Sequence, residues 1–257
     1  MNEIRIFAKK SLGQNFLISD GVITKIIAAT ESFQAEKIVE IGPGCGALTD
    51  LLRVKYKDII LIELDRDLIE FWKNENMQVI AGDALRIDWN FAKGRLLVSN
   101  LPYQISSSIV IDRSLEKEML IGMVLMFQKE VAQRIRANCQ TEHYGMLSVI
   151  AQEFWTMETV CEAGPRDFKP APKIASRVLK FTPRESTVQD RKKYLSFVKA
   201  CFKQRRRVLS TNISSLDEHF DRSRLPAWSL EHKKSDKVRA EELSPTELNS
   251  LYHYLKV

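Results

Sequence analysis

VEIGPGCG, residues 39–46, is the stretch of sequence that decides the fold. The apolar residues around Glu40 predict a buried strand over residues 37–41. The glycines that follow permit a tight turn and let a ligand approach the backbone, and a helix predicted over residues 47–54 would present unpaired N–H groups to it. Taken alone, the pattern is a moderate indication of a nucleotide-like ligand, and a plain glycine-rich turn would explain it as well.

Further apolar, β-branched runs follow at intervals of about twenty residues, with helix-like stretches such as residues 67–73 between them. These runs predict strands over residues 59–64, 78–81, 96–99 and 120–127, and then over 153–161 and 177–181. Strands that alternate with helices at this spacing indicate βαβ units. We therefore predict an α/β, Rossmann-like fold with a mostly parallel central sheet.

The character of the chain changes after Pro183 and becomes helical, basic and poor in strands. Residues 184–257 hold 16 Lys and Arg against 10 Asp and Glu, whereas residues 1–183 hold 23 of each. All of the net charge of +6 therefore belongs to the C-terminal segment. We predict a domain over 1–183 and a small all-helical domain over 184–257, whose basic surface suits a nucleic acid unless it is only a solvated face.

The last helix of the chain is marked by the sequence from Ser244 to Glu247. A serine three residues before a glutamate, with proline between them, predicts a capping box with proline at the first helical position. The predicted buried face of this helix consists of Leu248, Leu251, Tyr252 and Leu255.

Composition excludes several other classes of protein. The four cysteines form no C-x-x-C pair and the four histidines show no ligand spacing, so we expect neither a metal site nor a disulfide framework. The longest apolar run, from Met119 to Phe127, is too short to span a bilayer, and the N-terminus lacks an apolar signal core. We therefore expect a cytoplasmic protein with no membrane contact.

Polar residues stand at the ends of successive predicted strands. Glu63 lies 21 residues after Gly42, a spacing that suits a carboxylate accepting hydrogen bonds from both hydroxyl groups of a ribose, and Asp83 could accept a hydrogen bond from an adenine amine. An exposed acid at a strand end is the alternative for each one separately. Together they favour a ligand site, because the carboxyl ends of parallel strands meet in one crevice.

The segment from Asn100 to Tyr103 distinguishes this site from a nicotinamide site. The Asn100 side chain and the Leu101 carbonyl could both accept hydrogen bonds from an NH₂ group, with Pro102 fixing the backbone. Tyr103 could stack on the ring that carries that group. We therefore predict a site for a planar amino-heterocycle.

These features together resemble the ribosomal RNA adenine dimethyltransferases, which use S-adenosylmethionine (SAM) as methyl donor. The resemblance spans nearly the whole chain. Besides the two motifs above, it includes residues 11–17 (SLGQNFL), 168–174 (FKPAPKI) with Ser176, and 204–207 (QRRR). The C-terminal tail is short for the family, and Arg207 stands where the family usually has lysine.

The resemblance implies roles for individual residues. SAM contacts are implied for Asn15, Leu17, Gly42, Glu63, Asp83 and Asn100. Catalytic roles are implied for Asn100, Leu101, Pro102 and Tyr103. The target adenine would lie between Tyr103 and Phe168, and Arg205, Arg206 and Arg207 would contact RNA phosphates. An exposed helix surface is the alternative for the arginines, and ordinary loop packing is the alternative for Phe168.

The resemblance also implies a substrate. The family dimethylates the N6 amines of two adjacent adenosines in the 3′-terminal hairpin of small-subunit (16S) ribosomal RNA, within a pre-assembled small subunit, and we expect a monomer. Two other readings stay open. One is a large-subunit rRNA adenine methyltransferase that confers antibiotic resistance, against which Leu101 mildly argues because that family usually has isoleucine there. The other is a non-catalytic nucleic-acid-binding protein on the same scaffold.

Overall fold

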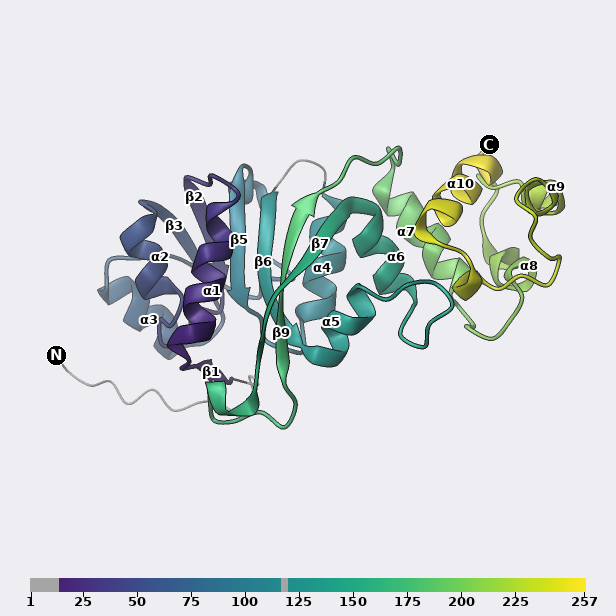
Figure 1. The fold of residues 1–257 in the computed structure, drawn as a ribbon. Helices are drawn as coiled ribbons and strands as arrows, with labels where there is room; N and C mark the ends of the chain where they lie inside the picture. Colours follow the sequence, from purple (N-terminus) through teal and green to yellow (C-terminus); the bar gives the residue numbers. More distant parts are fainter. Residues whose placement is uncertain (1–13, 117–119) are drawn as a thin grey trace. The chain divides into compact units, whose positions relative to one another are not determined.

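The computed structural model describes residues 14–116 and 120–257 (Figure 1). The chain divides into two compact units. The first, which we call the sheet unit, contains the described residues up to 132 together with residues 156–183. The second, the helical unit, contains residues 133–155 and 184–257.

The described part of the sheet unit is built on a seven-stranded sheet with the order β4-β3-β2-β5-β6-β9-β7. The strands from β4 to β6 pair in parallel, and β9 pairs antiparallel with β6. The prediction of an α/β fold with a mostly parallel sheet is confirmed. The strands are β2 (Lys37–Ile41), β3 (Asp58–Glu63), β4 (Gln78–Ala81), β5 (Arg95–Asn100), β6 (Leu120–Gln128), β7 (Trp155–Ala163) and β9 (Ser176–Pro183).

Helices alternate with these strands because the intervening segments have one apolar face. The helices are α1 (Asp20–Glu31), α2 (Thr49–Lys55), α3 (Arg66–Asn74), α4 (Ser106–Leu115) and α5 (Lys129–Ile135), which runs across the division between the units, with a 3₁₀ helix at Asn90–Ala92. One apolar cluster joins Ile23 of α1, Leu52 of α2 and Trp72 of α3 to Leu96 and Val124 of the sheet. The first three helices therefore share one core with the sheet.

The helical unit consists of short helices around an aromatic core. Its helices are α6 (Met146–Phe154), α7 (Arg191–Cys201), α8 (Leu209–Asn212), α9 (Leu225–Glu231) and α10 (Pro245–Leu255), with 3₁₀ turns at Ile213–Ser215, Arg222–Arg224 and Ala240–Glu242. The rings of Tyr194, Phe197, Phe220 and Tyr252 pack against one another with centroids 5.1 to 6.3 Å apart. Aromatic pairs in this range add stability beyond the apolar area that they bury.

The predicted C-terminal helix forms as expected. Ser244 Oγ accepts a hydrogen bond from the Glu247 N–H at 3.2 Å, and the Glu247 carboxylate accepts one from the Ser244 N–H at 2.8 Å. Pro245 is its first helical residue, and the predicted apolar face is fully buried. This capping box was readable from the sequence because all of its partners lie within four residues.

Two segments differ from the sequence-based assignment. The strand predicted over 153–161 begins only at Trp155, because Glu153 and Phe154 complete α6, so residues 133–155 pack in the helical unit and not with the rest of 1–183. The proline-rich loop 164–173 contains a 3₁₀ turn (Pro165–Asp167) and the short strand β8 (Phe168–Lys169), which pairs with β1 (Phe16–Leu17). Two-residue strands have no periodicity to detect.

Gly122, the third residue of β6, has no space beside it for a side chain, and this close packing generates a prediction. A Cβ built on Gly122 would lie 2.1 Å from the ring of Phe33, which follows α1. Gly122→Ala should therefore lower the free energy of unfolding by roughly 1–3 kcal/mol, measured by urea denaturation. Gly21→Ala, where a Cβ meets nothing within 4 Å, is the control and should not destabilise. Two outcomes would contradict this explanation. One is a Gly122→Ala variant as stable as the control, and the other is a Gly122→Ala loss that is just as large in a Phe33→Ala background.

Candidate active site

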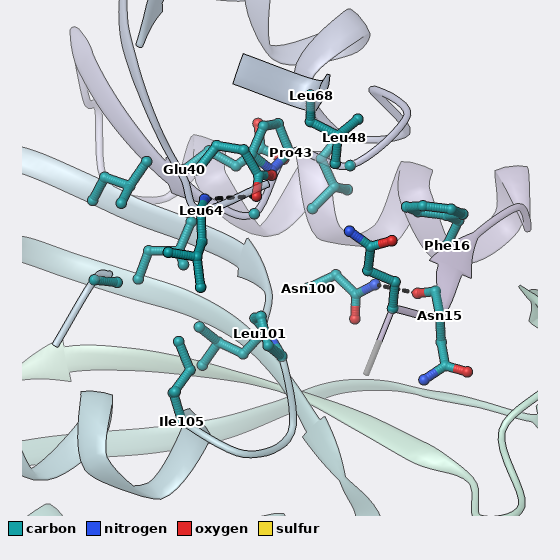
Figure 2. Close-up of a pocket in the computed structure, with 18 of the residues that line it drawn as sticks. Asn15, Phe16, Glu40, Pro43, Leu48, Leu64, Leu68, Asn100, Leu101 and Ile105 are labelled. Atoms are coloured by element: carbon teal, nitrogen blue, oxygen red, sulfur yellow. Dashed lines mark hydrogen bonds between the residues drawn. The ribbon is translucent and has the colours of Figure 1, made fainter. Parts of the chain in front are cut away.

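A pocket of about 280 Å³ lies at the carboxyl ends of the parallel strands, within the sheet unit (Figure 2). It is lined by residues from the segment before α1, the glycine turn after β2, and the ends of β3, β4 and β5. The predicted residues that line it are Asn15, Leu17, Gly42, Glu63, Asp83, Asn100, Leu101, Pro102 and Tyr103. Five segments that are far apart in the sequence thus meet around one cavity.

The turn after β2 can be built only with glycine at several positions. Gly42, Gly44 and Gly46 have φ angles of 65°, 54° and 95°, in the left-handed region that other residues rarely adopt. A Cβ on Gly46 would lie 2.9 Å from the Trp72 ring, whose Nε1 donates a hydrogen bond to the Gly44 carbonyl at 3.0 Å. Trp72 of α3 therefore supports the turn from behind. This role of Trp72 could not be predicted from the sequence, because a tryptophan at this position also fits an ordinary helix core.

Glu63 ends β3 with its side chain almost fully buried. Its Oε1 accepts hydrogen bonds from the backbone N–H groups of Leu64 at 2.7 Å and Asp65 at 2.8 Å. Burial raises the pKa of Glu63, and these bonds, together with one from the Gly44 backbone, oppose the rise. The carboxylate is thus fixed in direction at the cavity wall.

Asp65 links the segment before α1 to the helix that follows β3. Its Oδ1 caps α3 by accepting a hydrogen bond from the Asp67 N–H at 3.1 Å, and its Oδ2 accepts one from Gln14 Nε2 at 3.1 Å. Gln14 itself lines the pocket. The bond between Gln14 and Asp65 could not be predicted from the sequence, because the two residues are 51 positions apart.

Glu40 was not among the predicted site residues, yet it lines the pocket and is 1% exposed. The Thr49 hydroxyl donates to Glu40 Oε2 at 2.8 Å and lowers its pKa, but burial outweighs this bond and raises the pKa to about 8. Asp50 and Glu63 add to the rise. Glu40 is therefore mostly protonated at neutral pH. The signal available in the sequence was an acid inside an otherwise apolar strand.

The amide of Asn100, at the end of β5, is held in one orientation. Its Nδ2 donates a hydrogen bond to the backbone carbonyl of Asn15 at 3.1 Å (Figure 2). Because this bond engages the donor end of the amide, Oδ1 is the end that can accept a hydrogen bond from a ligand. The same contact fastens the segment before α1 to the end of the sheet.

Tyr103 is half-buried at the mouth of the pocket, and its hydroxyl lies 3.0 Å from Ser176 Oγ on β9. Burial raises the pKa of Tyr103, which the bond to Ser176 partly opposes. The phenol is thus neutral at physiological pH, and its ring is anchored at the far end. The sequence motif suggests no role for Ser176, and in the structure its hydroxyl bonds to the Tyr103 hydroxyl and holds that ring in place.

Phe168 does not line the pocket. It is 3% exposed and belongs to the same apolar cluster as Leu17, with which it pairs across β1 and β8. The resemblance implies that the target adenine lies between Tyr103 and Phe168, and for Phe168 this role stays a prediction. In the described structure its ring packs with Leu17 in the core, where burial of its apolar surface stabilises the fold.

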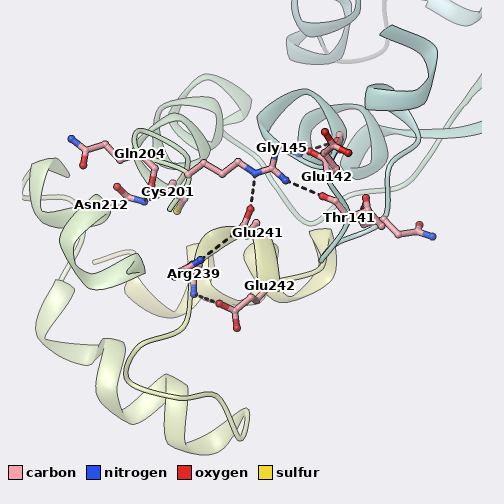
Figure 3. A network of polar contacts seen from close by, with 12 residues as sticks. Thr141, Glu142, Gly145, Cys201, Gln204, Asn212, Arg239, Glu241 and Glu242 are labelled. Carbon is pink, nitrogen blue, oxygen red and sulfur yellow. Dashed lines mark hydrogen bonds and ion pairs between the residues drawn. The ribbon is translucent and has the colours of Figure 1, made fainter. Parts of the chain in front are cut away.

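The three predicted RNA-binding arginines differ from one another, and all belong to the helical unit. Figure 3 shows Thr141, Glu142 and Glu241 of that unit within one network of polar contacts. Arg205 donates to Glu241 Oε2 at 2.6 Å, to the Thr141 carbonyl at 2.9 Å and to the Glu142 carbonyl. Arg206 and Arg207 are exposed, and no ion pair or side-chain hydrogen bond involves them within residues 14–116 and 120–257. The guanidinium of Arg205 is therefore engaged within the helical unit, where it links Glu241 to residues 141–142.

The described residues alone bear on whether the chain has a metal site or a membrane-spanning helix. Among these, no group of three or more His, Cys, Asp or Glu side chains could hold a metal ion, and no helix is long and apolar enough to cross a membrane. The cysteines are free thiols, with Cys161 and Cys201 buried. The motif residues Ser11, Leu12 and Gly13 lie outside the described part of the chain.

The buried carboxyl of Glu40 predicts a specific dependence of stability on pH. Its pKa is about 8 when folded and near 4.5 when exposed, so the folded state retains a proton that the unfolded chain releases. The contribution of Glu40 to stability should therefore fall by about 1.4 kcal/mol per pH unit as the pH rises from 5 to 8, and level off above 8. Glu40→Gln, which can still accept the bond from Thr49, should lose this dependence.

The measurement is the free energy of unfolding of both proteins at pH 5, 6.5 and 8. Glu40→Gln should gain on the wild type by a few kcal/mol across this range, while Glu36→Gln, at an exposed position, should not. Parallel curves for wild type and Glu40→Gln would show that Glu40 is not protonated when folded.

Comparison with known proteins agrees with this site. Residues 6–256 match the ribosomal RNA adenine dimethylase family. A protein of Bdellovibrio bacteriovorus named ribosomal RNA small subunit methyltransferase A is 53% identical, over 97% of this chain and 93% of its own length. A protein of the same name from Chlorobaculum tepidum is 37% identical, over 98% and 90%.

Solved structures give the same result. A dimethyladenosine transferase from Plasmodium falciparum aligns with a TM-score of 0.78 at 26% identity, over 92% of this chain and 95% of its own. The 23S rRNA methyltransferase ErmE aligns with a TM-score of 0.68 at 24% identity, over 94% and 99%, a likeness of fold alone. With the match to the family over almost every residue, these similarities establish that the chain belongs to the ribosomal RNA adenine dimethylases.

Proposed function

We propose that this protein transfers methyl groups from SAM to the N6 amines of two adjacent adenosines in the 3′-terminal hairpin of small-subunit rRNA. The observation that carries the proposal is the fixed amide of Asn100, whose Oδ1 is left to accept a hydrogen bond beside Leu101 and Tyr103. The name shared by the similar proteins supports small-subunit rRNA as the substrate. The work of the enzyme would be in small-subunit biogenesis, in the cytoplasm and as a monomer.

The residues around the cavity fit SAM. The Glu63 carboxylate, fixed by two backbone N–H groups, suits the paired hydroxyls of a ribose. Asp83 accepts a backbone bond from Leu85 with Oδ1 and stays partly exposed at the cavity, where it suits the adenine amine of the cofactor. Gly42 and Gly44 lack side chains, so the ligand can approach the backbone of the turn closely. Asn15 and Leu17, from the segment before α1, form another wall of the cavity.

Bound SAM supplies a methyl group already activated by a sulfonium. The protein's own task is to prepare the adenine amine, whose lone pair is delocalised into the ring. Asn100 Oδ1 and the Leu101 carbonyl accept hydrogen bonds from the two N–H groups of the amine, which favours a pyramidal nitrogen and aims its lone pair. Their partial negative charges also stabilise the positive charge that develops on this nitrogen. Catalysis thus comes mainly from positioning.

A strong general base is not required, because the proton can leave for solvent after transfer, when the nitrogen is cationic. No histidine or lysine is among the described residues that line the cavity. Tyr103 holds the base by stacking, with its hydroxyl tied to Ser176. The adenosine has to be splayed out of any stack to enter such a pocket. We assign stacking to Tyr103 alone, because Phe168 would first have to leave the core.

Recognition of the RNA backbone is proposed for Arg206 and Arg207, which are exposed and project free guanidinium groups. Arg205 would act indirectly by holding this turn against Glu241 and residues 141–142. The alternative of a large-subunit methyltransferase is less favoured, because Leu101 differs from that family and the similar proteins bear the small-subunit name. A non-catalytic role is less favoured because the acceptor groups and the cavity are intact.

The overall proposal is tested by mapping dimethyladenosine in small-subunit rRNA incubated with SAM, with and without the protein. Two adjacent dimethyladenosines in the 3′-terminal hairpin are expected. A single modified adenosine in large-subunit rRNA would instead support the resistance-type activity, and no transfer to either RNA would support the non-catalytic alternative.

The cofactor assignment predicts the effect of Glu63→Gln. Gln can still accept the backbone bonds but presents an uncharged amide to the ribose, so SAM should bind roughly 10- to 100-fold more weakly, about 1.5–3 kcal/mol. Isothermal titration calorimetry measures this. Glu70→Gln, on the exposed face of α3, is the control and should bind as the wild type does. Equal affinities for all three proteins would remove Glu63 from the cofactor site.

The stacking assignment predicts a separation of binding from turnover at Tyr103. Tyr103→Ala should bind SAM normally and lose most methylation at saturating RNA, because the base is no longer held flat. Tyr103→Phe keeps the ring and loses only the bond to Ser176, so it should retain most of the rate. Normal turnover by Tyr103→Ala would contradict the assignment.

A further inference from the structure

The exposed face of α7 carries a row of lysines that the proposed site does not use. Lys192, Ser196 and Lys199 follow one another at spacings of four and three residues, which places them on one side of α7. Lys203, in the turn after the helix, lines the same groove. All four are exposed, whereas Tyr194, Phe197 and Val198 on the opposite side are buried. Lys192 and Lys199 lie about 10 Å apart along the axis, two helical turns.

These residues form one wall of a groove within the helical unit. Lys193 also lines it, and the other wall is the segment from Ser215 to Phe220. Its two acids, Asp190 and Asp217, accept hydrogen bonds from the backbone N–H groups of Lys193 at 2.8 Å and His219 at 3.0 Å. The groove therefore holds four lysines against two carboxylates that are partly engaged with the backbone.

The ammonium groups of these lysines are unpaired in the described part of the chain. Within residues 14–116 and 120–257, the side chains of Lys192, Lys193, Lys199 and Lys203 take part in no ion pair or hydrogen bond, although the backbone of Lys193 bonds to Asp190 and that of Lys192 to Ser196. Elsewhere in the same unit Lys234 pairs with Glu247, and Arg205 is committed to Glu241. Four unpaired ammonium groups in one groove repel one another, and only an anionic partner relieves this repulsion.

We propose that the lysine row along α7 and the turn after it (Lys192, Lys199 and Lys203) binds the phosphate backbone of the substrate RNA. The inference rests on the proposed function, and extends RNA contact to a surface that the QRRR motif does not include. Lysine is suited to a backbone contact of this kind, because it acts as a point charge without the geometric demands of a bidentate fork. The row contributes affinity and orientation without reading sequence.

The test is the salt dependence of binding to unmodified small-subunit rRNA transcribed in vitro. Contact with three phosphates contributes about −2 to −3 to the slope of log affinity against log salt. The variant K192Q/K199Q/K203Q should lose that part of the slope and bind roughly tenfold or more weakly at low salt. K192R/K199R/K203R keeps the charge and should retain the wild-type slope.

The matched control is K233Q/K237Q/K256Q, which removes three exposed lysines from the same unit and changes the net charge equally. It should flatten the slope much less. An unchanged slope for K192Q/K199Q/K203Q, or an equal loss in the control, would overturn the proposal. Thermal unfolding checks that each variant is folded, and the arginine variant separates loss of charge from loss of structure.

Failure of this inference can be told from failure of the proposed function. Methyl transfer from labelled SAM by the wild type tests the function and does not depend on the variants. If transfer occurs and the lysine variant binds with the wild-type slope, only the docking surface is wrong. If no RNA is methylated, the function is wrong, and the slopes still report whether α7 binds RNA.

Discussion

The parallel pairing of β2 with β3 on one side and β5 on the other is the constraint on which the site depends. The register places Ile41 opposite Ile62, so the turn after β2 and the carboxylate of Glu63 are adjacent by construction. Hydrogen bonds tie these strand ends together: the Gly42 N–H donates to the Ile62 carbonyl at 2.8 Å, and Ser99 Oγ donates to the Ile41 carbonyl at 2.6 Å. A shift of one residue in either pairing would separate the groups of the pocket.

Two buried acids next to this junction have different environments. Glu40 receives one side-chain hydrogen bond and is fully buried, so the neutral form is favoured. Glu63 receives several backbone N–H groups, which offset part of the cost of burying its charge. The same strand ends can thus hold one carboxyl as a neutral structural group and present the other to a ligand, because the hydrogen-bond donors are distributed unequally.

The sequence predicts the fold to the extent that its signals are local. The parallel strands and the buried face of α10 follow from periodicity, and the capping box at Ser244 follows from a four-residue motif. The pocket residues converge because strand ends in a parallel sheet must meet. Neither the burial of Phe168 nor the support of Gly44 by Trp72 could be read in this way, since each depends on a partner far along the chain. The engagement of Arg205 with Glu241 was hidden for the same reason, so three adjacent arginines looked equivalent.

The difference between Arg205 and the lysines of α7 bears on how charge in a sequence should be interpreted. Residues 184–257 hold the whole excess of positive charge, but a charge attracts RNA only if no carboxylate of its own chain neutralises it. Arg205 lies in the most conspicuous basic motif and is largely neutralised, whereas Lys192, Lys199 and Lys203 are spread over twelve residues and are not. Because the fold gathers those lysines along one groove, dispersed charges can form a stronger surface than a contiguous run. Net charge locates the unit for which RNA binding is proposed, and pairing within the structure decides which of its charged residues remain available to a partner.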